Sequence, residues 1–217
     1  MNNFKNIFFL VFLLQSFYTT FAQSDFKNEK NQIKKDIQKS VIEFNNTDYT
    51  KALEYSKYAL INSFAINDNL LIAQSYNTIG VIYDECQETQ KAIEFYHKAL
   101  RYASEVKNDT LNNWIYSNLG SVYYFNEIDV KKGIGYYKKA LRFAEKVKDS
   151  SQIIYTKLNL ASAYFSIDSI VQGEKQISPI KNTILRKGRL EEIISDFVDR
   201  KDEILDIISK NYDKNKK

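Results

Sequence analysis

The 217-residue sequence contains only one cysteine, Cys86, and only one histidine, His97. A single cysteine cannot form a disulfide within the chain, and these two residues do not make the paired spacings of zinc sites. The chain also lacks a glycine-rich phosphate loop and a His-Glu-x-x-His helix. These absences exclude the common catalytic constellations, so we expect a protein that is not an enzyme and has no cofactor or metal site.

Helix-breaking residues are equally scarce, with one proline and six glycines in a chain that is 44% hydrophobic. This composition leaves long stretches free to form helices and supplies enough apolar side chains for a core. Pro179 is the one proline, and we expect its helix to kink there or to restart with Ser178 as a new N-cap.

A strong charge of either sign is also missing, because 31 Lys and Arg residues are balanced by 27 Asp and Glu residues. The net charge of +4 is spread evenly and is too small to indicate a nucleic-acid partner. The Lys-rich residues 212–217 are most simply a disordered basic tail.

Residues 1–22 have the pattern of a signal peptide. The apolar run Ile7–Leu14 is too short for the roughly 20 residues that span a bilayer. Thr20-Phe21-Ala22 ends in the small residues that a signal peptidase accepts. We therefore expect cleavage after Ala22, an exported protein in the periplasm or outside the cell, and no stable membrane insertion afterwards. An uncleaved membrane anchor is the alternative.

The stretch from Ala73 to Leu100 carries the most informative pattern in the sequence. Small and large residues recur there at fixed spacing, namely Ala73, Tyr76, Ile79, Gly80, Tyr83, Ala92, Tyr96 and Ala99. This spacing resembles the tetratricopeptide repeat (TPR), with Ile for Leu and Tyr for Trp and Phe. The resemblance implies an all-α, right-handed superhelical solenoid of antiparallel helix pairs. Gly80 weakens a helix interior, and we expect it to allow close packing where two helices cross.

The same pattern recurs along the chain at intervals of 40, 41 and 40 residues, measured between the small residues Ala52, Ala92, Gly133 and Gly173. This near-constant step predicts four repeats, at about residues 26–66, 70–107, 110–148 and 150–187. Asp48 is the expected N-cap of the first repeat's second helix. Polar tripeptides are expected to cap the later repeats, namely Asn67-Asp68-Asn69, Asn108-Asp109-Thr110 and Lys148-Asp149-Ser150. Residues 189–211 predict a closing C-terminal helix without a TPR signature.

In TPR proteins, particular positions of each first helix line a concave groove. The resemblance assigns to this groove Trp114, Ser117, Asn118, Ser121, Tyr124, Phe125, Tyr155, Leu158, Asn159, Ser162 and Phe165. The members in the third repeat step by three or four residues, so they share one helix face. The five aromatic residues are expected to be apolar anchors. Asn118 and Asn159 resemble the asparagines by which some TPR proteins hold the main chain of an extended peptide.

The resulting interpretation is a non-catalytic scaffold that binds an extended peptide or a partner helix in its groove. One alternative is a sensory input domain, or a shortened member of a TPR-containing signalling regulator. Another is an accessory subunit of an envelope enzyme. The aromatic stripe could instead pack against the neighbouring repeat or against the chain's own C-terminal helix, and the pattern does not indicate the oligomeric state.

Overall fold

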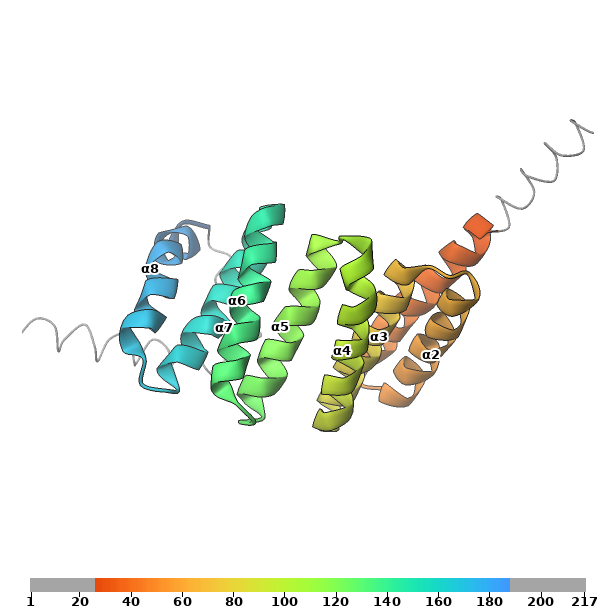
Figure 1. The fold of residues 1–217 in the computed structure, drawn as a ribbon, viewed down its shortest axis with the longest axis horizontal. Helices are drawn as coiled ribbons and strands as arrows, with labels where there is room; N and C mark the ends of the chain where they lie inside the picture. The colour runs from red at the N-terminus through yellow and green to blue at the C-terminus, as the bar shows by residue number, and fades with distance from the viewer. Residues whose placement is uncertain (1–25, 188–217) are drawn as a thin grey trace, which may run out of the picture. The chain divides into compact units, whose positions relative to one another are not determined.

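The computed structural model describes residues 26–187, and every regular element within that range is an α-helix (Figure 1). The predicted signal peptide, closing helix and basic tail lie outside the described residues. The chain divides into two compact units, and the boundary falls between Lys107 and Asn108.

Both units are built from antiparallel helix pairs joined by short turns. Unit 1 contains a helix over residues 26–45 followed by α2 (Tyr49–Ala65), α3 (Asn69–Glu85) and α4 (Thr89–Val106). Unit 2 contains α5 (Asp109–Phe125), α6 (Val130–Val147), α7 (Ser150–Phe165) and α8 (Ile170–Lys187). Within unit 2 each helix packs on the next, and α5 also contacts α7. The all-α arrangement of paired helices is therefore the one that the sequence pattern predicts.

The turns share one construction. The residue before most helices is Asp or Asn, and its side chain accepts a hydrogen bond from a backbone amide of the first helical turn. These residues are Asp48, Asp68, Asn108, Asp129 and Asp149. The predicted N-cap at Asp48 is confirmed by a 3.0 Å bond from the Lys51 amide. A non-glycine residue with positive φ lies in every turn, namely Thr47, Asn67, Gln87, Lys107, Glu127, Lys148 and Asp168. Glycine is usual at this position, so these turns carry some backbone strain.

Small residues lie where the helices of a pair cross, as predicted. A Cβ added to Gly80 would lie 2.7 Å from the ring of Tyr96 on α4. At Gly133 the closest atom is the backbone oxygen of Gly120, 3.0 Å from where a Cβ would be. Gly80 therefore makes room for a ring, whereas Gly133 lets two helix backbones approach each other.

Unit 1 is also held by an ion pair between distant parts of its chain. Lys30 Nζ lies 2.6 Å from the carboxylate of Asp68, which also accepts the Leu71 amide. Burial raises the pKa of Asp68, but the bonds from Lys30 and from the Leu71 amide lower it by more. The net pKa therefore lies below its usual value. Beside this pair, Ile33, Ala59 and Leu71 form a buried apolar cluster.

Of the two expectations for Pro179, a kink or a restart of the helix, the restart is wrong. Helix α8 runs without interruption from Ile170 to Lys187, with Pro179 inside it, so it does not restart at Ser178. Ser178 and Pro179 are both exposed. At an exposed position, the carbonyl that loses its amide donor can be hydrated by water, which lowers the cost of an internal proline.

Candidate binding surface

The predicted groove residues lie on α5 and α7 of unit 2, but their surroundings differ. Trp114 and Phe125, near opposite ends of α5, are 43% and 47% exposed. Asn118 and Tyr155 are half-buried. The remaining members are buried or hydrogen-bonded inside the unit.

Tyr124 is a core residue and not an open anchor, which agrees with the alternative that the stripe packs against the neighbouring repeat. It is buried in a cluster with Ile134 and Tyr137 of α6 and with Leu160 of α7. The sequence places Tyr124 on the groove side of α5. In the structure the neighbouring first helix, α7, covers that side at this level, so Tyr124 packs between two helices.

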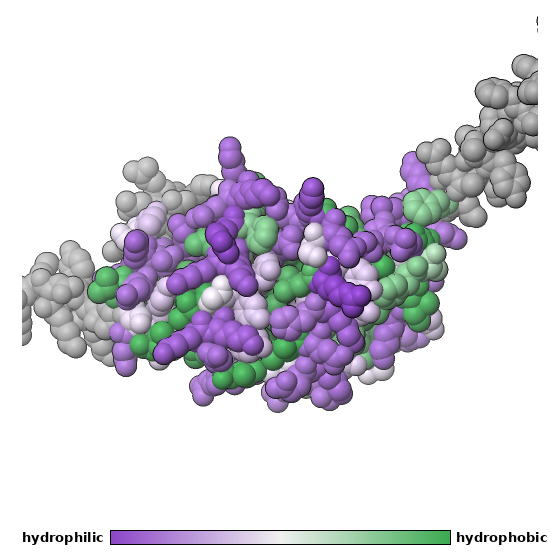
Figure 2. All heavy atoms as spheres, viewed as in Figure 1, coloured by the Kyte–Doolittle hydropathy of each residue, from purple (hydrophilic) through white to green (hydrophobic). Residues whose placement is uncertain are grey.

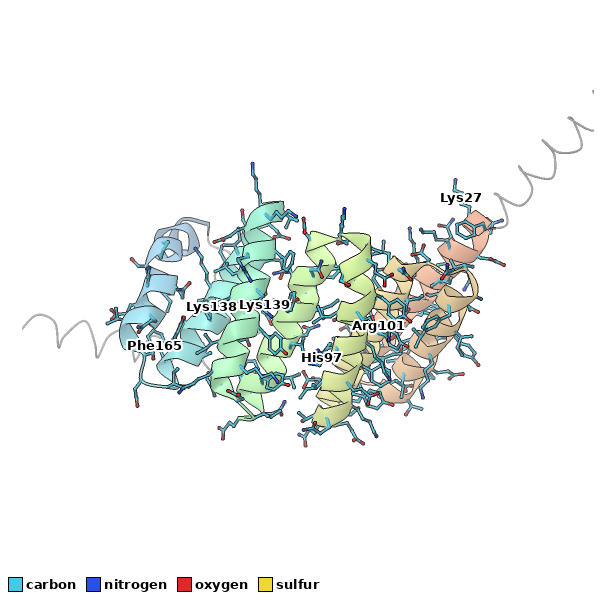
Figure 3. The ribbon with its side chains drawn as sticks, in the orientation of Figure 1. Lys27, His97, Arg101, Lys138, Lys139 and Phe165 are labelled. Atoms are coloured by element: carbon cyan, nitrogen blue, oxygen red, sulfur yellow. The ribbon has the colours of Figure 1, made fainter. Side chains whose placement is uncertain are left out.

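Phe165 also differs from the prediction. Its ring packs against α8, and a Cβ added to Gly173 would overlap its Cε1 atom; Figure 3 labels Phe165. Ala161 and Ile177 complete this buried cluster. Because Gly173 lacks a side chain, the Phe165 ring fills the space beside it and is not available as an anchor.

Polar groups on α5 and α7 are buried without hydrogen-bond partners. Asn159 is fully buried, and neither its amide nitrogen nor its amide oxygen is paired. The hydroxyls of Ser117 and Ser162 are also unpaired, whereas Ser121 hydrogen-bonds the Tyr137 hydroxyl at 3.1 Å. An unpaired buried polar group typically costs about 1–3 kcal/mol. Asn159 is therefore an unusual feature that packing alone does not explain.

A second surface, which the repeat pattern does not predict, consists of aromatic rings covered by lysines. In unit 1 the ring of Tyr76 contacts Phe64, Phe95 and Tyr102, with centroid distances of 5.8–6.1 Å. Lys98 Nζ lies 4.8 Å from the Phe95 ring centroid. Burial raises the pKa of Tyr76.

Unit 2 repeats this arrangement with different residues. Tyr116 stacks on Phe143 and Tyr136, and Lys139 Nζ lies 5.4 Å and 5.5 Å from the two tyrosine centroids. Cation–π contacts of this kind contribute roughly 0.5–1 kcal/mol at exposed sites. The rings pack between the two helices of a pair, and the lysine side chains lie over them. This surface therefore stabilises the helix pairs. The only sign of it in the sequence is the large number of tyrosines, 16.

Within residues 26–187, no group of three or more His, Cys, Asp or Glu side chains is placed to hold a metal ion. Among the same residues, no helix has the length and apolarity of a membrane span. His97 is exposed on α4 (Figure 3).

Comparison with known proteins identifies the fold. No protein-family model matches the chain, and no curated protein matches its sequence. The crystal structure of BtubC from P. vanneervenii superposes with a TM-score of 0.63 at 17% identity, covering 71% of this chain. TPR-like repeats of the kinesin light chain type from Podosopora anserina superpose with a TM-score of 0.57 at 12% identity, covering 72% of this chain and 76% of theirs. A second structure of those repeats gives 0.55 at 11% identity, with coverages of 71% and 76%.

The chain has the TPR-like fold. It spans 63% of the length of BtubC, so the likeness covers only part of that protein. In the repeats predicted from the sequence, α5 and α7 are the first helices of the third and fourth repeats. Helices α4, α6 and α8 are second helices.

Proposed function

We propose that the protein is a non-catalytic scaffold that binds an extended peptide or a partner helix along the first helices of unit 2. The observation that carries the proposal is the exposure of two large rings, Trp114 and Phe125, on one first helix. Large aromatic side chains are the residues that most often dominate the binding energy of protein interfaces. TPR-like neighbours support a protein partner in general.

The unpaired amide of Asn159 supports a ligand that offers main-chain groups. A carboxamide can donate to a peptide carbonyl and accept from a peptide amide at once. In the free protein Asn159 is covered, so the side chains above it must move aside before a ligand reaches it. A bound main chain would then satisfy both of its atoms.

Tyr124 and Phe165 are not part of the proposed contact, because they are buried within helix pairs. Asn118 and Tyr155 are half-buried and remain candidate contacts. The proposed binding surface therefore consists of Trp114, Asn118, Phe125 and Tyr155, with Asn159 beneath it.

The binding proposal is tested by selecting ligands from a displayed library of random peptides. The purified protein is compared with a variant that carries Trp114→Ala and Phe125→Ala. Tyr58→Ala with Ile61→Ala is a matched control, because these residues are also large, apolar and exposed but lie on α2. Peptides enriched by the wild type and the control, and not by the α5 variant, are the expected result.

The proposal includes export, which rests on the signal-peptide pattern of residues 1–22. The intact mass of the protein purified from the exported fraction tests this part. A chain that begins at Gln23 is expected. A mass that retains residues 1–22 would contradict cleavage and favour the anchored alternative.

A further inference from the structure

Helix α6 carries a stripe of positive charge on its exposed side. It contains six lysine and arginine side chains and one carboxylate, Glu145. With about 100° of rotation per residue, all six lie within about 60° of Gly135 around the helix axis. We call these residues the α6 stripe: Lys131, Lys132, Gly135, Lys138, Lys139, Arg142 and Lys146. Lys138 and Lys139 mark it in Figure 3, and Figure 2 shows hydrophilic side chains over this helix.

Most of this charge is not balanced by carboxylates. Among residues 26–187, Lys146 alone in the stripe forms an ion pair, with Asp109 at 2.7 Å. Lys132 instead donates to the Tyr123 hydroxyl, and Lys138 lies over the Tyr164 ring. Helix α4 of unit 1 differs, because Lys91 pairs with Glu88 at the start of that helix and Lys98 pairs with Glu94 within it. The positive charge of α6 is therefore available to an outside partner.

Gly135, at the centre of the α6 stripe, has open space beside it. At Gly80, Gly120, Gly133 and Gly173, an added Cβ would lie 3.0 Å or less from a neighbouring atom, but at Gly135 nothing lies within 4 Å. Packing within the unit therefore does not require this glycine, which weakens the interior of an exposed helix.

The repeat spacing identifies the residue at the same position of α4. The equivalent residue on α4 is Glu94, which pairs with Lys98 at 2.6 Å. Glycine in its place removes that carboxylate and leaves Lys139, the residue equivalent to Lys98, without it. The centre of the stripe is thus both uncharged and open to close approach by another backbone.

The partner that fits the α6 stripe is an acidic helix. A second α6 is excluded by like charge, whereas residues 189–209 contain seven acidic and three basic side chains. Five of the acids recur with helical spacing, namely Glu192, Asp196, Asp199, Glu203 and Asp206. As a helix this row would be about 21 Å long, close to the roughly 22 Å from Lys131 to Lys146. This segment lies outside the described residues, and its helix is predicted from the sequence.

The apolar residues of the segment indicate whether its acidic row contacts its own chain or a second copy. Leu190, Ile194, Phe197, Leu205 and Ile208 lie on the side of the predicted helix opposite to the acidic row. If the apolar side packs on its own chain as a closing helix, the acidic row faces outward. We propose that the acidic row of one copy docks on the α6 stripe of a second copy.

The first experiment changes Gly135. Sedimentation of the purified protein over a range of concentrations measures its self-association at low and at high salt. Gly135→Glu restores the carboxylate found in α4 and is expected to weaken association about tenfold or more. Gly135→Ala strengthens the helix without adding charge, and it is expected to weaken association less. A wild type that stays monomeric, or a Gly135→Glu protein that associates like the wild type, would overturn the proposal.

The second experiment exchanges the charges between copies. Lys138→Glu with Arg142→Glu, and separately Asp199→Lys with Glu203→Lys, should each abolish self-association at low salt. A mixture of the two variants should associate again, because each reversed surface meets its complement on the other copy. Lys34→Glu with Lys35→Glu makes the same change in net charge as the Lys138 and Arg142 variant, but elsewhere, and should have no effect. A mixture that remains monomeric would show that the acidic row does not dock on a second copy.

Discussion

The ring of Tyr137 lies directly on Gly120, where an added Cβ would be 2.6 Å from the ring's Cδ1 atom. Other repeats show the same relationship between paired residue sizes. Gly80 faces Tyr96, while in the fourth repeat Ala161 shares a buried cluster with the smaller Ile177. A larger residue on the first helix thus accompanies a smaller one on the second.

Exchanging one pair for another tests this relationship. Gly120→Ala should lower the free energy of unfolding by about 1–3 kcal/mol, because it overfills the space beneath the Tyr137 ring. Tyr137→Ile alone should cost about 2 kcal/mol or more through the cavity it leaves. The double variant reproduces the Ala161–Ile177 pair and should cost clearly less than the sum of the two. Urea denaturation of all four proteins measures the coupling, and strictly additive costs would contradict it.

The residues that could be predicted from the sequence are those whose role depends on neighbours at fixed spacing. Gly80, Gly120 and Ala52 lie at helix crossings because the repeat places them there, and Asp48 caps α2 because a short acidic side chain reaches the first amides. The helix pairs follow from the same short-range spacing.

The candidate site was predictable only in part, because several side chains have alternative neighbours. The face of Tyr124 is the groove side by spacing, but the distance between α5 and α7 decides whether a ring there is open or buried. Phe165 is buried because Gly173 leaves space for it. The lysines over the aromatic rings depend on side-chain reach, which a periodic pattern does not specify.

Thr47 should be a site of stored backbone strain. Its φ of 61° lies in the left-handed region, which is least favourable for a β-branched residue. Thr47→Gly is expected to raise the free energy of unfolding by about 1 kcal/mol. Asn67 has a φ of 52°, and because asparagine tolerates this conformation, Asn67→Gly should give a smaller gain. Thermal denaturation compares the two, and a loss of stability in Thr47→Gly would be evidence against strain.

Acid should destabilise the wild type partly through Asp68. Its pKa is lower in the folded than in the unfolded protein, so its contribution is complete above about pH 4 and is lost as the pH falls further. Asp68→Asn should be less stable than the wild type at neutral pH, and the difference should shrink below about pH 4. Lys30→Met removes the other partner and should behave similarly. Parallel pH curves for the wild type and Asp68→Asn would contradict the assignment.

The Asn159 amide is expected to lower the stability of the free protein and to strengthen peptide binding. Replacing the unpaired buried amide with leucine of similar size removes a desolvation cost, so Asn159→Leu is expected to leave stability unchanged or raise it by about 1 kcal/mol. The same change should weaken binding of a selected peptide. A large loss of stability would instead show that the amide supports the fold of the free protein.

The most direct measurement of the proposed function is the affinity of a selected peptide, determined by calorimetry for the wild type and two double variants. Trp114→Ala with Phe125→Ala should weaken binding by about 2 kcal/mol or more, while circular dichroism shows that the protein remains folded. Tyr58→Ala with Ile61→Ala should bind like the wild type. If the α5 variant keeps the wild-type affinity, or if the α2 control loses it, the first helices of unit 2 are not the binding surface.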